Sequence, residues 1–212
     1  MPVTSTHARL YPAAFAAVAA LLGAPAADAA RPGPQNLTRL IADADQIVAG
    51  KVTRVVDGVS PSGLPYTEVT IAVAASAKGE LRGGKPYTFR QFGLIEPREM
   101  PDGRMLAAVT PEGFPRWQEG EQVVVFLSRP AARTGLQTTA GLAQGKLTVR
   151  NGRIANEFNN RGLFEGVIIN DDLITEKERA MLSSEGPVDV ATFVALVGRA
   201  VEENWIAREE MR

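Results

Sequence analysis

The sequence contains no cysteine and only one histidine, His7, among its 212 residues. Without cysteine the chain forms no disulfide bond and carries no lipid on a thiol, so its stability has to come from an apolar core. If residues 1–29 are removed, as argued below, His7 goes with them. The rest of the chain then cannot use a Ser-His-Asp or Cys-His mechanism or build the usual zinc site. Carboxylate, lysine, serine and tyrosine chemistry remain.

An excess of charge of one sign is also missing, because 23 basic residues face 24 acidic ones. Residues 30–212 keep 22 basic and 23 acidic residues. This balance argues against a general nucleic-acid or membrane-surface binder, which would show a basic excess. The charges are unevenly placed, since residues 30–170 hold 17 basic and 13 acidic groups and residues 171–212 hold 5 and 10. A mildly basic body therefore precedes an acidic tail.

The first 29 residues predict an export signal. Arg9 is the only charge before the apolar run AAFAAVAALLGA, and small residues and Ala-Asp-Ala at 27–29 follow it. A membrane span needs roughly 20 apolar residues, and this run has twelve. We therefore expect cleavage before Ala30, a periplasmic or secreted location, and no stable membrane insertion of the mature chain.

The middle of the chain reads as a set of strands behind one short helix. Leu37, Leu40 and Ile41 lie at helical spacing, and Asn36 can cap the first turn of that helix. Runs rich in β-branched and aromatic residues, bounded by glycine, proline or polar clusters, predict strands. These runs are residues 46–56, 66–75, 85–92 and 121–128, with 162–169 as a possible last strand.

This order favours a mainly β protein with flanking helices (α+β), because strands and helices do not alternate. For residues 30–170 we expect a small antiparallel barrel of the oligonucleotide/oligosaccharide-binding (OB) type, with a β-sandwich as the alternative. Residues 171–212 predict a helical segment packed on the barrel. Thr175 and Glu178 form a capping box, and an apolar stripe from Val190 to Trp205 follows Asp189 as the cap. A free helix that binds a partner is the alternative.

The stretch GLAQGKLTV, residues 141–149, resembles a phosphate-binding loop at first sight. Such a loop needs four residues between its glycines and Ser or Thr after the lysine. Here three residues separate Gly141 from Gly145, and Leu147 follows Lys146. The Asn-Gly pair at 151–152 signals a hairpin, so a strand rather than an anion-binding helix follows. We expect no nucleotide binding and interpret both glycines as bulge or close-approach positions.

Four fragments carry a family resemblance: ADQIVAGKV, YTEVTIAVAASAKGEL, GEQVVVFL and GLAQGKLTV. Together they resemble a family of uncharacterised exported bacterial proteins over residues 44–149. More weakly, the order of elements is similar to netrin-like OB-fold modules, which include the tissue inhibitors of metalloproteases. Those inhibitors chelate zinc through an N-terminal cysteine, which this chain lacks, so no inhibitory residue carries over. The resemblance implies an OB-type fold and a function in binding proteins or saccharides.

Three carboxylates in LIEPREMPDGR are candidates for a catalytic pair or a calcium cluster: Glu96, Glu99 and Asp102. Arg98 and Arg104 alternate with them, which favours a solvated loop rim.

Other acidic and basic residues also have simpler interpretations. Asp171 and Asp172 fit the start of a helix, and Lys51, Lys78 and Lys146 are interpreted as surface lysines. The sequence therefore predicts no catalytic residue, no cofactor and no metal ligand.

The connection between the strands at 85–92 and 121–128 is far longer than the usual four to six residues, and such loops are commonly functional or disordered. It carries residue types enriched at binding hot spots, and we expect Arg98, Arg104, Phe114 and Trp117 to contact a partner. The alternative is that the two aromatic side chains plug the barrel end. The sequence thus favours an exported, non-enzymatic module that binds a protein or saccharide, with a carboxylate-only hydrolase such as a glycosidase as the alternative.

Overall fold

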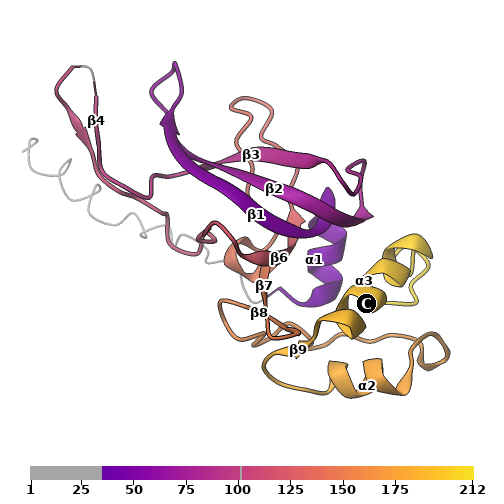
Figure 1. The fold of residues 1–212 in the computed structure, drawn as a ribbon. Coiled ribbons are helices and arrows are strands. Elements are labelled where there is room, and N and C mark those ends of the chain that lie inside the picture. The colour runs from indigo at the N-terminus through magenta and orange to yellow at the C-terminus, as the bar shows by residue number, and fades with distance from the viewer. Residues whose placement is uncertain (1–34, 101) are drawn as a thin grey trace, which may run out of the picture. The chain divides into compact units, whose positions relative to one another are not determined.

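The computed structural model describes residues 35–100 and 102–212, and the expected export signal lies outside them. Seven strands form one antiparallel sheet in the order β3-β2-β1-β6-β7-β8-β9 (Figure 1). These strands are β1 (Gln46–Val59), β2 (Pro65–Lys78), β3 (Pro86–Phe92), β6 (Gln122–Leu127), β7 (Lys146–Arg150), β8 (Arg153–Asn156) and β9 (Val188–Asp189). A separate hairpin pairs β4 (Arg98–Glu99) with β5 (Met105–Leu106). The expected mainly β fold with flanking helices is confirmed.

Helices flank the sheet, and each begins at the cap that the sequence predicts. They are α1 (Leu37–Asp43), α2 (Glu176–Leu182) and α3 (Val190–Glu202), with short 3-10 helices η1 (Leu142–Gly145) and η2 (Asp171–Leu173). The Asn36 side chain accepts a hydrogen bond from the first turn of α1, and Asp189 does the same for α3. Thr175 and Glu178 form the complete capping box of α2. These bonds satisfy amide groups that a helix start otherwise leaves without a partner.

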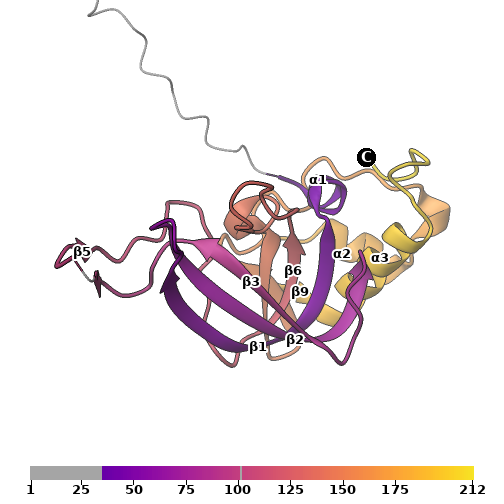
Figure 2. The same cartoon turned by 90° about the horizontal axis from the view of Figure 1, so that it is seen from above.

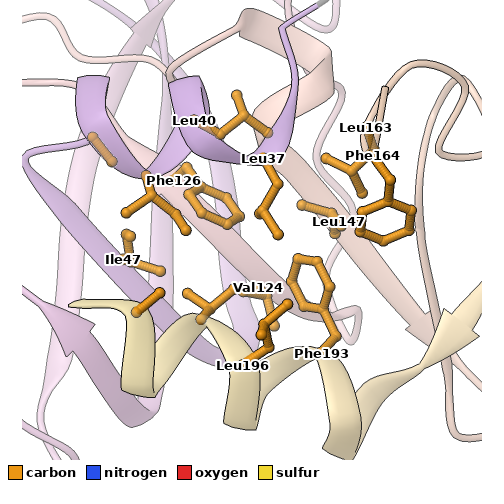
Figure 3. Packing of buried hydrophobic residues seen from close by; sticks show 14 of the residues in the cluster. Leu37, Leu40, Ile47, Val124, Phe126, Leu147, Leu163, Phe164, Phe193 and Leu196 are labelled. Atoms are coloured by element: carbon orange, nitrogen blue, oxygen red, sulfur yellow. The ribbon is translucent and has the colours of Figure 1, made fainter. Parts of the chain in front are cut away.

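One apolar core lies between the sheet, α1 and α3 (Figure 3). Leu37 and Leu40 of α1 point toward Phe126 of β6, while Phe193 and Leu196 of α3 approach from the opposite side. All five side chains are fully buried. The terminal helix is therefore docked rather than free.

A second core fills the other face of the strongly curved strands β1, β2 and β3. Its members are Val48, Val52, Val69, Ile71, Val73, Phe89, Trp117, Val123, Val125 and Leu127. In β2 the buried residues alternate with less buried ones, as expected for a strand with one face in a core.

Within the described residues the strand order is open, with β3 and β9 as its edges, so the expected OB-type barrel is not confirmed. The segment 137–140 nevertheless lies beside both β3 and the end of β6. The amide of Gln137 donates to the Arg90 carbonyl on β3 at 2.8 Å, and the Ser128 amide donates to the Thr138 carbonyl at 2.9 Å. This segment thus covers part of the β3 edge without forming a full strand.

The structure differs from the sequence prediction in two places near the C-terminus. Residues 162–169 form turns and irregular backbone instead of a last strand, because Gly162 and Gly166 adopt φ angles of 76° and 67°, outside the range of regular strands. The apolar stripe also outlasts its helix, since α3 ends at Glu202 and Asn204 follows with a left-handed φ of 56°. No helix within residues 35–100 and 102–212 has the length and apolar character to cross a membrane.

Candidate functional site

Residues 94–100 and 102–110 belong to a projecting hairpin, called the arm below. Leu94 and Val109 exchange two backbone hydrogen bonds of 2.8 and 3.0 Å at its base, and β4 pairs with β5 further out. Figures 1 and 2 show the arm extending from one end of the sheet, with the three α-helices toward the other end. The arm is therefore a feature separate from both apolar cores.

Asp57 of β1 fixes the base of the arm to the sheet. Its Oδ2 accepts hydrogen bonds from the amides of Ile95 and Glu96 at 2.7 and 2.9 Å, and its Oδ1 accepts one from Thr67 at 2.9 Å. The Arg98 guanidinium donates to the Asp57 carbonyl at 3.0 Å. One carboxylate and one guanidinium thus set the direction in which the arm leaves the sheet.

The charged residues of the arm face solvent. Arg104 pairs with Asp102 at 2.7 Å, with 76% and 51% of the two side chains exposed, so this ion pair stabilises the arm little. Glu96 and Glu99 are exposed as well. No group of three or more potential metal-ligating side chains occurs in the described part of the chain. The carboxylates thus form a solvated rim and not a converging site.

Exposed apolar side chains are concentrated at this end of the molecule. Seven large apolar residues of the described ranges are exposed, and five of them lie on the arm or on the strand ends beside it. These five, called the arm surface below, are Val56, Phe92, Ile95, Met105 and Val109. Met105 and Ile95 are the most exposed of the five, at 62% and 49%. Contiguous exposed apolar patches are typical of interaction surfaces.

Trp117 was expected to be either a contact residue or a plug, and its side chain is buried, with 6% exposed. Its ring meets the ring of Phe89 edge-on at 5.4 Å, and its Nε1 donates to Gln91 Oε1 at 3.1 Å. Phe114 is half-buried. The burial of Trp117 favours the plug, while contact through Arg98, Arg104 and Phe114 stays a prediction.

A groove of about 700 Å³, called the basic groove below, lies over β7, β8 and the segment before β6. Its charged lining residues are Arg116, Glu121, Lys146, Arg150, Arg153 and Glu157, and its uncharged polar ones are Gln118, Thr148, Asn151, Asn156 and Asn159. The groove was not predicted, because its residues come from three separate segments of the chain, 115–121, 143–159 and residue 187.

Lys146 forms the floor of the basic groove, contrary to its interpretation as a surface lysine. Only 9% of its side chain is exposed. The ammonium group lies 2.5 Å from Glu121 Oε2, donates to the Arg116 carbonyl at 2.5 Å, and lies 5.0 Å from the centre of the Trp117 ring. Two hydrogen-bond acceptors and an aromatic ring offset the free-energy cost of burying the ammonium group.

Lys78 is also partly withdrawn from solvent, whereas Lys51 is exposed. The Lys78 ammonium donates to the carbonyls of Ile41 and Ala42 at 2.7 and 3.1 Å. These bonds cap two carbonyl groups in the last turn of α1. Burial lowers the pKa of Lys78. This lysine therefore has a structural role at a helix C-terminus.

Glu178 shows the same structural use of a buried charge. Burial raises the pKa of this carboxyl group, but hydrogen bonds from Arg199 and Thr175 outweigh it, so that the pKa is lowered overall. Arg90 lowers the pKa of Glu68, and the amide of Thr192 lowers that of Asp189. Every carboxyl group with a shifted pKa in the described residues is therefore held in its charged form.

Comparison of this chain with protein-family models, curated proteins and solved structures finds no match. The family resemblance therefore stays a prediction from the sequence fragments.

Proposed function

We propose that the protein is an exported, non-enzymatic binding module that contacts a protein partner through the arm surface. The observation that supports this proposal is the concentration of exposed apolar side chains on a projecting hairpin. Aliphatic and thioether side chains suit a protein better than a saccharide, whose hydroxyl groups need polar partners. The bonds to Asp57 hold the base of the arm before binding, which reduces the entropy lost on association.

The proposal includes an OB-type barrel as the scaffold. Support comes from the segment 137–140, whose bonds to Arg90 and Ser128 place it between β3 and β6. The second core lies on the face of β1, β2, β3 and β6 that such a barrel would enclose. In this arrangement the arm leaves one end of the barrel, as a binding loop on a rigid support does.

The export part of the proposal has its own test. Mass spectrometry of the protein isolated from its native cells should give a chain that begins at Ala30 and is found in the periplasm or medium. An intact Met1, or protein confined to the cytoplasm, contradicts export.

A carboxylate-only hydrolase is less well supported. A general acid among carboxylates needs a raised pKa and a concave setting. The carboxylates on the arm are exposed, and the shifted carboxyl groups are shifted downward. These observations favour binding over catalysis.

The experiment that tests the arm surface compares two variants with a matched control. Met105→Asp and Ile95→Asp each place a charge on the arm, whereas Ile168→Asp places one on a side chain that is 56% exposed elsewhere. Affinity capture from native periplasmic extract, measured by quantitative mass spectrometry, should show the arm variants losing a partner at least about tenfold, the effect of one buried aliphatic side chain. The control should capture the partner normally.

Melting curves of all three variants should match that of the wild type, because the replaced side chains contact little in the folded chain. If the arm variants retain the partners that wild type and control capture, the arm is not the binding surface.

A further inference from the structure

The basic groove is built apart from the arm and carries an excess of positive charge. Lys146 and Glu121 neutralise each other on its floor. Arg116, Arg150 and Arg153 remain at the rim, opposed there only by Glu157 among the charged lining residues of the described chain. The groove is therefore suited to an anion.

Two of these guanidinium groups are unused by the fold. Neither the Arg116 nor the Arg150 side chain makes a hydrogen bond or ion pair with any residue of the ranges that the structure describes. Arg153 donates one bond to the Pro187 carbonyl. Arginine forms paired, charge-assisted bonds with carboxylates and related groups, so two such donors are free for a ligand.

The placement of Arg150 costs stability in the absence of a ligand. Arg150 and Arg153 are direct partners across the antiparallel pair β7 and β8, and like charges directly opposite each other destabilise a sheet. Arg153 also pairs in register with Asp189 of β9, which compensates its charge. No described acidic residue of a strand pairs in register with Arg150 as Asp189 does with Arg153, and the nearby Glu121 is engaged by Lys146. An anion bound at Arg150 would offset this repulsion.

The uncharged part of the lining indicates the rest of the ligand. The side chains of Gln118, Thr148, Asn151 and Asn159 line the groove and make no hydrogen bond with the described part of the chain. Amide and hydroxyl groups both donate and accept, which matches the hydroxyl groups of a sugar. Among the described residues of the lining there is no aromatic side chain on which a nucleobase could stack.

We propose that the basic groove binds a short anionic saccharide, with carboxylates held by Arg116 and Arg150 and hydroxyl groups held by the amide side chains. The volume of about 700 Å³ lies within the range of sites for small organic ligands and exceeds what a single inorganic anion needs. The floor is held by Lys146, which bonds to the Arg116 carbonyl and to Glu121. This proposal does not depend on the partner of the arm.

Titration calorimetry of the purified protein tests the proposal with four probes: trigalacturonate, maltotriose, triglutamate and inorganic phosphate. Trigalacturonate should bind, with an affinity that falls as salt is added because the contacts are between charges near the surface. Maltotriose has hydroxyl groups without carboxylates and should bind at least about tenfold more weakly, the effect of losing one charge-assisted hydrogen bond.

Three variants locate the binding. Arg116→Gln and Arg150→Gln should each weaken trigalacturonate binding about tenfold for the same reason. Arg133→Gln makes the same charge change at an exposed arginine that does not line the groove, and it should bind like the wild type. The melting temperature should stay unchanged for Arg116→Gln and Arg133→Gln and should rise slightly for Arg150→Gln, which removes the repulsion with Arg153. Met105→Asp on the arm should also bind trigalacturonate normally.

Four results would overturn the proposal. They are absence of trigalacturonate binding at millimolar concentration, equal binding of maltotriose, binding of triglutamate or phosphate as tight as that of trigalacturonate, and equal weakening by Arg133→Gln. Tight binding of triglutamate would identify the groove as a site for acidic peptides instead.

Discussion

Replacing Trp117 by alanine separates a structural role of this side chain from a role in partner contact. The ring belongs to the second core, with 6% of its surface exposed. Truncating a buried Trp or Phe to alanine costs about 3–5 kcal/mol through lost burial and the cavity that remains. The ammonium of Lys146 loses its aromatic neighbour as well. A domain has a total stability of about 5–15 kcal/mol, so this single change should be severe.

A second variant, Trp117→Phe, divides this cost into packing and hydrogen bonding. Phenylalanine keeps an aromatic ring beside Phe89 but loses the bond from Nε1 to Gln91 Oε1. That oxygen also accepts a bond from Thr138 at 3.3 Å, so it is not left without a donor. The loss should therefore be near the lower end of about 1–3 kcal/mol for a disrupted buried hydrogen bond.

Urea and thermal unfolding, both followed by far-ultraviolet circular dichroism, measure the stability of both variants without relying on tryptophan fluorescence. Trp117→Ala should lower the melting temperature by roughly 6–20 °C, at 2–4 °C per kcal/mol for a chain of this size. Phe114→Ala, at a half-buried position, is the control and should cost less. If Trp117→Ala changes stability by under about 1 kcal/mol and abolishes partner capture, the plug interpretation is wrong and Trp117 is a contact residue.

Two further predictions concern the helices. The pKa of Glu178 is lowered below its ordinary value of 4.5 in the folded chain. The ionised carboxylate should therefore contribute fully to the free energy of unfolding above pH 4.5, and this contribution should be lost as the pH falls toward the lowered pKa. Glu178→Gln should thus destabilise the protein by roughly 1–3 kcal/mol at neutral pH and by clearly less in acid, as urea unfolding at both pH values would show; a pH-independent loss contradicts this. Phe193→Ala should cost about 3–5 kcal/mol because the side chain is fully buried, whereas Phe158→Ala, at a position 45% exposed, should cost much less; equal melting curves would contradict the docking of α3.

Local signals account for the parts of the fold that the sequence predicts well. A cap such as Asn36 acts on amides within three residues of itself, and the Asn-Gly turn between β7 and β8 needs the left-handed φ angles of 51° and 73° that these two residues adopt readily. The same local reading fails for residues 162–169. Leu163, Phe164 and Ile169 pack into the first core from a segment of turns. Within this segment only Ile169 forms a β-bridge, to Met211.

The candidate sites depend on contacts that are distant in sequence, which explains why the sequence did not show them. The arm is recognisable as a long connection, but its exposed apolar surface includes Val56 and Phe92 from strands on either side of it. Likewise, Lys146 is buried only because Glu121 and the Arg116 carbonyl lie beside it, 25 and 30 residues earlier. No pattern around Lys146 itself carries this information.

The glycines near Lys146 connect the fold to the basic groove. A Cβ atom at Gly145 would lie 1.9 Å from the Ala140 carbonyl oxygen, and Gly141 begins η1 with a left-handed φ of 65°. Both glycines thus permit the tight approach that precedes β7, in agreement with the close-approach interpretation. Because β7 begins at Lys146, this turn fixes where the lysine enters the sheet and pairs it opposite Val125 of β6. The sequence that resembled a phosphate loop therefore positions the floor of the proposed anion site through strand geometry, without an anion-binding helix.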